Sequence, residues 1–369
     1  MDFTEICEGK TCFVVPRQDE SSHFPPGTAP VFFNPRMEIN RDATVLTLSL
    51  VRPEHYLDAM GATGVRGLRV SVECGIPVTI NDRSDEALAL IRENVYRAGG
   101  GVEVVQEDAN VLLSRRRFDA VDLDPFGTPA FFVDSAVRAA GRYLFVTATD
   151  TAPLCGAHQK AGMRRYFARV LNNEYHAETG LRVLMGFIAR ETVKYDRGIS
   201  PLFCFVREHF VRVHFRVHYG AGQADRTMEH LGHVYQCPAC PFRTERRGLL
   251  PEPVECPRCG AGLVPQGPLW LGRVQDHDLL DRMRTALPGM TLGSAKDLDR
   301  LLQICREEPD LSFHYDYHRL AKFEGISPPP IDQLLERLRE RGYLATRAHY
   351  SGYAIKTDAP LDILLAALR

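Results

Sequence analysis

The sequence predicts an α/β fold built on a parallel sheet. Short apolar strand patterns alternate with helical patterns between Arg41 and about Ala140, and a glycine-rich turn follows the first strand at residues 61–67. Two strand-like runs then close the pattern at residues 202–218. Strands that alternate with helices form parallel sheets whose two faces are covered by helices. At 369 residues the chain is long enough for two or three domains.

The elements follow one another in a regular order. Expected strands span residues 56–58, 78–82, 102–106, 118–123 and 142–149, and expected helices span residues 41–51, 65–73, 86–97 and 134–140. Residues 202–207 and 210–218 read as an antiparallel hairpin, since only Glu208 and His209 separate them. Five parallel strands with a closing reversed hairpin are the organisation of class I (Rossmann-like) methyltransferases, although periodicity alone establishes only an α/β domain.

The chain beyond residue 220 has a different pattern. Residues 221–232 read as a polar linker, and a cysteine cluster follows through about Pro265. Further helices are expected at residues 279–286 and 296–308. The C-terminal part reads as two helices and a β-ribbon, at residues 317–323, 331–341 and 343–356. This mainly helical arrangement predicts a winged-helix-like ending.

Composition restricts the classes of function. The formal net charge is −2, so any basic surface for nucleic acid must be local. No apolar run approaches the length of a membrane helix, and no charged and then apolar leader is seen. Six of the ten cysteines are scattered, at Cys7, Cys12, Cys74, Cys155, Cys204 and Cys305. This usage favours a reducing compartment over a disulfide framework, so we expect a cytoplasmic protein without a membrane partner.

A cofactor site is expected at the carboxyl ends of the strands. A tight turn with exposed backbone is permitted by three glycines, Gly61, Gly64 and Gly67. Asp82 ends the second strand, where a carboxylate can accept hydrogen bonds from both hydroxyls of a ribose. Asp108 and Ala109 follow the third strand, where an acid and an amide can bind the edge of an adenine.

Each acid alone is as typical of a loop or a helix cap. Acids at three successive strand ends, Asp58, Asp82 and Asp108, favour a nucleoside-containing cofactor instead. The turn lacks the glycine spacing of a dinucleotide fingerprint, and no lysine follows it. These features favour S-adenosylmethionine over NAD or ATP.

A second candidate site is the run Asp124-Pro125-Phe126-Gly127 after the fourth strand. The nitrogen of an exocyclic base amine is a poor nucleophile, so its methylation needs an acceptor for the amine hydrogens and in-line placement. Asp124 and the carbonyl of Pro125 can accept them, and Phe126 can stack on the base. A strand-end turn closed by Pro and Gly is the alternative explanation. Asp122, two residues earlier on the same strand face, is a supporting candidate.

At this point the chain resembles the tRNA (guanine-26-N2) dimethyltransferase family, in particular its archaeal members. The matching pieces are Val31 to Met37, Asn40-Arg41-Asp42, Asp58 to Arg66, Asn81-Asp82, Glu107-Asp108-Ala109, Asp122 to Gly127 and Thr149-Asp150-Thr151-Ala152. They span roughly residues 8–265 in the family's order. The resemblance implies a substrate tRNA whose guanine 26 receives one and then two methyl groups on N2.

The same resemblance implies roles for individual residues. In the family the cofactor is contacted by residues that match Arg41, Arg66, Asp82, Asp108 and Ala109. Either arginine can pair with the methionine carboxylate of the cofactor, although a surface helix charge is the alternative. Asp124 would be the catalytic carboxylate. Candidates to hold a flipped guanine are Phe126 together with Phe32 or Phe33.

Two Cys-x-x-Cys knuckles, Cys237/Cys240 and Cys256/Cys259, are separated by fifteen residues. This spacing suits a tetrahedral four-thiolate zinc site with no open position, which makes the metal structural. An iron–sulfur cluster or a redox pair is the alternative. His314 and His318 have ligand-like spacing, but a structural role is expected for them. We therefore expect a methyltransferase domain at residues 1–225 and a C-terminal domain at residues 226–369, with a zinc ribbon at about 233–265.

A basic stretch with few acids lies between residues 164 and 216. Its cations are Arg164, Arg165, Arg169, Arg182, Arg190, Lys194, Arg197, Arg207, Arg212 and Arg216, with Tyr166, Phe167 and Tyr195 among them. Such a run can follow RNA phosphates, and a solvated helix face is the alternative. Arg337, Arg339 and Arg341 carry the same ambiguity because acids neighbour them.

Three rival functions stay open. An enzyme that methylates N2 of guanine at another tRNA position would share these motifs. N6-adenine enzymes more often carry Asn- or Asp-Pro-Pro-Tyr at the position of Asp124 to Gly127. A non-catalytic zinc-ribbon RNA-binding protein would not need the series of acids. The oligomeric state is left open, and a monomer is compatible with the sequence.

Overall fold

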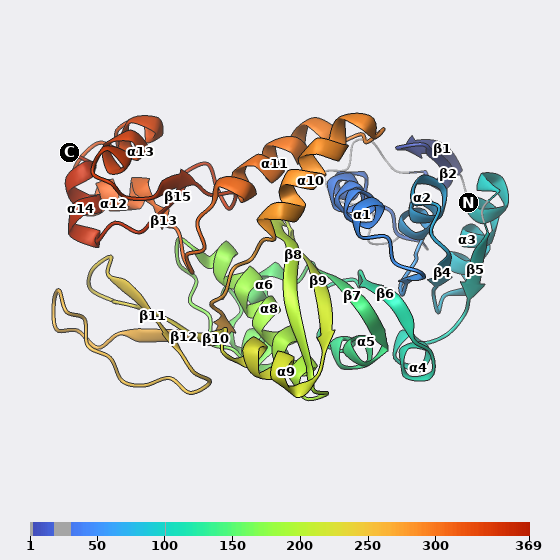
Figure 1. The fold of residues 1–369 in the computed structure, drawn as a ribbon, viewed down its shortest axis with the longest axis horizontal. Helices are drawn as coiled ribbons and strands as arrows, with labels where there is room; N and C mark the ends of the chain where they lie inside the picture. The colour runs from blue at the N-terminus through green and yellow to red at the C-terminus, as the bar shows by residue number, and fades with distance from the viewer. Residues whose placement is uncertain (1–2, 18–30, 100) are drawn as a thin grey trace. The chain divides into compact units, whose positions relative to one another are not determined.

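A seven-stranded mixed sheet organises the computed structural model, which describes residues 3–17, 31–99 and 101–369 (Figure 1). The strand order is β5-β4-β3-β6-β7-β9-β8. The strands are β3 (Tyr56–Asp58), β4 (Val78–Asn81), β5 (Val102–Val105), β6 (Phe118–Leu123), β7 (Ala140–Ala148), β8 (Arg197–Arg207) and β9 (Phe210–Tyr219). The pairs among β3 to β7 are parallel. Strands β8 and β9 are neighbours joined by two residues, which requires an antiparallel hairpin. The predicted α/β sheet is thus confirmed.

Helices cover both faces of the parallel strands (Figure 1). One face carries α1 (Glu38–Val51), α2 (Val65–Cys74) and α3 (Asp85–Ala98), and the other carries α4 (Ala109–Arg115) and α5 (Val133–Ala139). Because both faces are covered, the strand residues are apolar and buried, as at Leu57, Ile80 and Val121. Local signals set the helix ends, since Ser84 caps α3 and Gly99 ends it at φ +68°.

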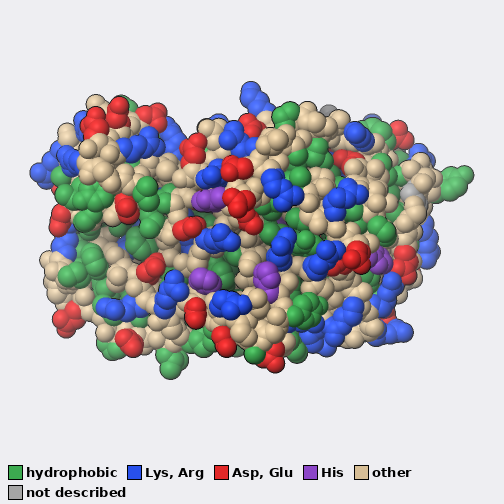
Figure 2. Space-filling model, viewed as in Figure 1, with side chains coloured by type: hydrophobic (Ala, Val, Ile, Leu, Met, Phe, Trp, Pro, Cys, Tyr) green, Lys and Arg blue, Asp and Glu red, His purple; other side chains and the backbone are tan. Residues whose placement is uncertain are grey.

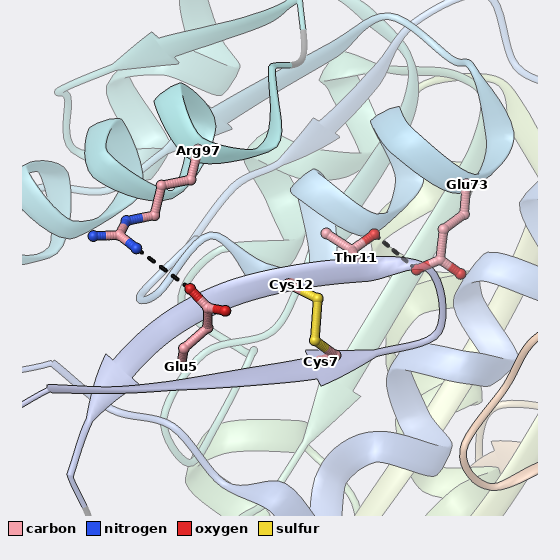
Figure 3. The surroundings of a disulfide bond; sticks show 6 residues. All are labelled: Glu5, Cys7, Thr11, Cys12, Glu73 and Arg97. Atoms are coloured by element: carbon pink, nitrogen blue, oxygen red, sulfur yellow. Dashed lines mark hydrogen bonds and ion pairs between the residues drawn. A yellow bond between two sulfur atoms is a disulfide. The ribbon is translucent and has the colours of Figure 1, made fainter.

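An N-terminal hairpin, β1 (Phe3–Glu8) and β2 (Thr11–Pro16), carries a disulfide between Cys7 and Cys12 (Figure 3). The two cysteines face each other in the strand register, with Cα atoms 4.1 Å apart. Thr11 Oγ1 also donates a hydrogen bond to Glu73 of α2 at 3.0 Å. The expectation that Cys7 and Cys12 are scattered thiols is wrong, because the turn at Gly9 brings this pair together.

Removal of this disulfide is expected to destabilise the protein by about 2 kcal/mol. The effect is modest because the closed loop is short, so the disulfide removes little chain entropy from the unfolded state. The test compares the free energy of unfolding of the wild type with that of a Cys7→Ser/Cys12→Ser double variant by chemical denaturation. Cys155→Ser, at a free half-buried cysteine, is the matched control. An unchanged denaturation midpoint in the double variant would contradict the expectation.

The chain divides into two compact units. Unit 1 comprises residues 1–147, 214–217 and 277–302, and unit 2 comprises residues 148–213, 218–276 and 303–369. Unit 1 contains β1 to β6, most of β7, part of β9 and helices α1 to α5, whereas β8 belongs to unit 2. It also contains α10 (His277–Ala286), the short 3-10 helices η1 (Pro35–Met37) and η2 (Leu287–Gly289), and most of α11 (Ala295–Glu307). Ser294 donates from both its backbone N–H and its hydroxyl to the buried carboxylate of Asp42 in α1.

Unit 2 begins with helices α6 (Thr151–Leu154), α7 (Gln159–Tyr166) and α8 (His176–Val193). Residues 221–232, expected as a linker, instead form helix α9 (Ala221–Met228) and the start of β10. The expectation was wrong because only a narrow face of α9 is buried, at Ala224 and Thr227, and the rest is polar. Thr227 Oγ1 accepts a hydrogen bond from the backbone N–H of Ile199 in β8 at 3.0 Å.

Two small sheets follow in unit 2. Strands β10 (Leu231–Gln236), β11 (Arg243–Arg247) and β12 (Val264–Trp270) form one in the order β11-β10-β12. Strands β13 (Tyr315–Asp316), β14 (Ala345–Arg347) and β15 (Ala354–Thr357) form the other in the order β13-β15-β14, with helices α12 (Tyr317–Phe323), α13 (Ile331–Glu340) and α14 (Leu361–Ala367). Leu320, Leu334, Leu338 and Leu364 share one core there. Among the described residues, no helix has the length and apolar character needed to cross a membrane.

Candidate functional site

The parallel register brings the predicted site residues to one edge of the sheet in unit 1. Asp58 at the end of β3 lies opposite Ile80 of β4 and Asp122 of β6. Asp82 and Asp124 follow directly after β4 and β6. Open α/β sheets bind ligands beyond the carboxyl ends of their strands, and these acids surround that position.

The turn after β3 is packed closely on β4. Gly61 donates its N–H to the carbonyl of Asn81 at 2.8 Å, and Gly64 has φ +78°. A Cβ at Gly61 would lie 2.4 Å from the side chain of Ile80, and one at Gly67 would lie 2.6 Å from it. These two glycines are therefore required for contact between the turn and β4, in addition to any contact with a ligand.

Asp58 is buried below this turn and accepts a hydrogen bond from the N–H of Gly67 at 3.0 Å. Burial raises the pKa of Asp58 to about 7, and the nearby Asp122 acts in the same direction against the opposing charge of Arg66. Asp122 itself accepts a 2.7 Å hydrogen bond from the hydroxyl of Tyr56. Asp58 thus stabilises the turn through a buried hydrogen bond to its backbone.

Asp58→Asn is expected to flatten the pH dependence of stability. The folded state raises the pKa of Asp58 from 3.8 to about 7. The contribution of Asp58 to the free energy of unfolding is therefore fully present below the unfolded value of 3.8 and is lost as the pH rises through about 7. The loss is on the order of 4 kcal/mol. The free energy of unfolding of the wild type and the variant would be measured by urea denaturation from about pH 4 to pH 8. Parallel curves for the two proteins would contradict the assigned pKa.

Asp82 and Asp108 are oriented by backbone amides. Asp82 accepts hydrogen bonds from the N–H of Ala62 at 2.9 Å and of Ser84 at 3.0 Å. Asp108 caps helix α4 by accepting from the N–H of Asn110 and Val111. Asp82 is half-buried and Asp108 is exposed, so both carboxylates are accessible at the sheet edge. Ala109 begins α4 beside Asp108 and is buried.

Arg66 reaches Asp124 directly. Its guanidinium pairs with the carboxylate of Asp124 and also donates to Asn40 Oδ1 at 3.0 Å and Thr44 Oγ1 at 2.8 Å. Although burial opposes it, the carboxylates of Asp124 and Asp122 raise the pKa of Arg66 above its usual value. The arginine is therefore charged and held in place. The surface-charge alternative for Arg66 is wrong, since only 4% of the residue is exposed.

Arg41 is buried as well. It donates to the carboxylate of Glu8 at 2.7 and 2.5 Å and to the carbonyl of Asn34 at 3.2 Å. Sequence reasoning missed Glu8 because its partner lies 33 residues away. Asn40 was part of a matching motif but had no predicted role, and Thr44 was not a candidate; their spacing of four on α1 places them on one helix face.

The aromatic candidates differ in exposure. Phe33 is 5% exposed and packs on Phe13 and under the guanidinium of Arg41, so it belongs to the core. Phe126 is 72% exposed, and Phe32 packs edge-on against it with ring centroids 4.4 Å apart. Phe32 and Phe126 are therefore the pair of aromatic candidates that a planar ligand can contact.

The chain is similar to known proteins over nearly its full length. A family model described as N2,N2-dimethylguanosine tRNA methyltransferase matches residues 10–369. The chain belongs to this family. A tRNA (guanine(26)-N(2))-dimethyltransferase of Methanoculleus marisnigri is 62% identical over 364 residues, covering 99% of this chain and 98% of the relative. A protein of the same description from Methanosphaerula palustris is 61% identical over 368 residues, covering 100% and 99%.

A solved structure of Trm1 from Pyrococcus horikoshii, in complex with S-adenosyl-L-methionine, is similar over 99% of this chain and 100% of its own. The TM-score is 0.90 at 35% sequence identity. This likeness confirms the methyltransferase fold of the family.

Four cysteine side chains of this family member converge in unit 2. The sulfur atoms of Cys237 and Cys259 are 3.4 Å apart, those of Cys240 and Cys256 are 3.6 Å apart, and all four lie within 4.8 Å of one another. Four thiolates around one zinc ion at about 2.3 Å would be separated by about 3.8 Å. The donor set and spacing therefore fit a tetrahedral zinc ion.

Cys305, Glu308 and His349 form a second group of ligand-like side chains in unit 2. His349 Nδ1 lies 2.6 Å from the carboxylate of Glu308, and its Nε2 accepts from the N–H of Val206. The ammonium of Lys356 is 3.4 Å from the same carboxylate. Partners of the imidazole and a neighbouring cation identify this group as a buried polar network, distinct from the four-cysteine cluster. His314, bonded to buried Glu178 at 2.9 Å, has the expected structural role.

The basic stretch is only partly accessible. Arg182 and Arg212 are 1% and 0% exposed, and Arg182 pairs with Glu178 and donates to the carbonyls of Trp270 and Gly272. Arg190 donates to the carbonyls of Pro268 and Tyr166. Arg182 and Arg212 were expected to follow RNA phosphates. This expectation is wrong, since buried guanidinium groups cannot reach RNA. On the face that Figure 2 shows, acidic and basic side chains are interspersed, so a basic RNA surface must be local there.

Proposed function

We propose that this chain transfers one and then two methyl groups from S-adenosylmethionine to N2 of guanine 26 in tRNA. The family, shared over nearly the whole length of its relatives, supports the reaction. The main observation in support of the site is the ion pair between Arg66 and Asp124 at the carboxyl edge of the sheet. Asp58 at the end of β3 and Asp82 after β4 lie at the same edge. The ion pair joins the proposed cofactor residues to the proposed catalytic carboxylate.

The cofactor would be held by residues from three strand ends. Asp82 binds the ribose hydroxyls, while Asp108 and the amide of Ala109 bind the adenine. Arg41 and Arg66 provide the cations for its methionine carboxylate, and Asp58 and Gly61 shape the turn that it contacts. When bound, S-adenosylmethionine supplies an electrophilic methyl group. The accessibility of Asp82 and Asp108, and the amides that orient them, support these assignments.

Asp124 would act on the guanine. The N2 amine loses one proton for each methyl group that it gains, and the carboxylate of Asp124 accepts that proton. The carbonyl of Pro125 accepts the other amine hydrogen, which positions the nitrogen lone pair. Phe126 and Phe32 hold the base, which must first leave the stack of the tRNA core at a cost of a few kcal/mol. Arg66 fixes the orientation of Asp124 during both transfers.

The remaining assignments belong to the same proposal. Cys237, Cys240, Cys256 and Cys259 bind a structural zinc ion in a ribbon formed by β10 to β12. Strand order β13-β15-β14, with α12 and α13 between β13 and β14, supports a winged-helix-like end. The division into a methyltransferase domain at residues 1–225 and a C-terminal domain at residues 226–369 stays a prediction, as does a cytoplasmic location.

The function is tested with purified protein, S-adenosylmethionine and unmodified tRNA, followed by mass spectrometry of the nucleosides. The expected product is N2,N2-dimethylguanosine. A matched tRNA with inosine at position 26 lacks only the N2 amine and should receive no methyl group. Methylation of the inosine tRNA would assign the reaction to another position, and a methyladenosine product would overturn the proposed substrate.

A further inference from the structure

Helix α7 of unit 2 is anchored by Asp150, a residue of the family motif at residues 149–152 that the proposed active site does not use. The carboxylate of Asp150 accepts a 2.6 Å hydrogen bond from the hydroxyl of Tyr166 and lies 3.1 Å from the guanidinium of Arg165. Its side chain is only 7% exposed. Asp150 therefore anchors Arg165 and Tyr166, which lie in the last turn of α7.

The residue that ends α7 is unusual. Phe167 has φ +48° and ψ +41°, the left-handed conformation in which helix ends normally carry Gly or Asn. A bulky side chain in this region is strained. The ring is nevertheless 68% exposed, so packing in the core does not compensate for the strain. An exposed aromatic ring at such a position is expected where the ring contacts a partner.

Cations flank Phe167 in the sequence. Arg164 and Arg169 are exposed on either side of Phe167 in the sequence, and the side chain of Arg165 is 37% exposed. The backbone of Arg169 is itself fixed, since its N–H and carbonyl both bond to Gly267 at 2.8 Å. An exposed aromatic ring with exposed cations next to it in the chain is a combination that binds a nucleic acid base together with its flanking phosphates.

We propose that the end of α7 is a tRNA contact, in which Phe167 stacks on an unpaired base while Arg164 and Arg169 pair with neighbouring phosphates. This inference rests on the proposed function for the identity of the RNA. An unpaired base is required because the bases of a duplex are covered by their neighbours. Asp150 is a positioning residue that presents the ring.

Substitutions at Phe167 separate stacking from backbone strain. Phe167→Asn removes the ring but tolerates the left-handed conformation, so folding is preserved. Phe167→Tyr keeps a ring of the same shape. Met163→Ala, at a residue 50% exposed on the same helix, is the matched control. The measurements are the dissociation constant for unmodified tRNA, its salt dependence, and KM for S-adenosylmethionine.

Phe167→Asn should weaken tRNA binding by about tenfold or more, with KM for S-adenosylmethionine unchanged. Phe167→Tyr and Met163→Ala should stay within about twofold of the wild type. Arg164→Ala should lower the slope of log affinity against log salt by about one. Unchanged tRNA affinity in Phe167→Asn, or an equal loss in Phe167→Tyr, overturns the proposal. If the wild type binds tRNA but does not methylate it, the proposed function fails while this contact is still tested.

Discussion

Asp124→Asn is expected to lower the rate of methyl transfer by about 10²- to 10⁴-fold, the usual contribution of a positioned proton acceptor. Asparagine has nearly the same shape and still accepts a hydrogen bond from Arg66, but it cannot accept the amine proton. Single-turnover rates of nucleoside methylation would be measured alongside the dissociation constant for S-adenosylmethionine. The cofactor affinity should change only a few-fold, since the ribose and adenine contacts lie at other strand ends.

Asp119→Asn provides the matched control for this variant. Asp119 lies on the same strand β6, but it pairs with Arg142 at 2.5 Å and is remote from the carboxyl end of the strand. Its replacement should leave the transfer rate unchanged. If Asp124→Asn retained more than about a tenth of the wild-type rate, the proposed role as proton acceptor would have to be abandoned.

Loss of the proposed zinc ion is expected to have the second large effect. Cys237→Ser should reduce the zinc content from one ion per chain to nearly none, because a structural site with one thiolate missing loses much of its affinity. Apparent binding free energies for such sites are about 10–16 kcal/mol in small zinc peptides, so unfolding of β10 to β12 should follow. Metal analysis and hydrogen exchange of this segment are the measurements.

Cys305→Ser serves as the control, because it changes the second ligand-like group and leaves the four-cysteine cluster intact. Its zinc content should equal that of the wild type. Two zinc ions per wild-type chain, with one lost in Cys305→Ser, would show that the buried network binds metal after all. Visible absorption typical of iron and sulfide would instead replace zinc by an iron–sulfur cluster.

Local patterns were sufficient for much of the fold and the candidate site. Acids after successive strands, such as Asp82 and Asp124, could be placed at one sheet edge because parallel strands share the direction of their ends. The two Cys-x-x-Cys knuckles could be paired from spacing alone. Helix α9 was missed because its buried face is small, and a short polar helix has almost the same composition as a linker.

Side-chain partners that are distant in sequence could not be predicted. The carbonyls that bind Arg182 lie 88 and 90 residues away, so a buried cation looked like part of an RNA-binding stretch. Phe32 and Phe33 are adjacent and chemically identical, and only packing against Phe13 decides that Phe33 is core. The pairing of Cys7 with Cys12 depended in the same way on the register of a hairpin.

The sequence by itself determined the α/β architecture and the family, and it provided the candidate site residues, since these follow from periodicity, strand-end positions and motifs that are local along the chain. The tertiary structure alone decided that Arg66 meets Asp124 and that Phe126 is accessible while Phe33 is not. It also decided that Phe167 stands exposed at the end of α7. Burial and ion pairing depend on which distant segments pack together, and no local pattern records that.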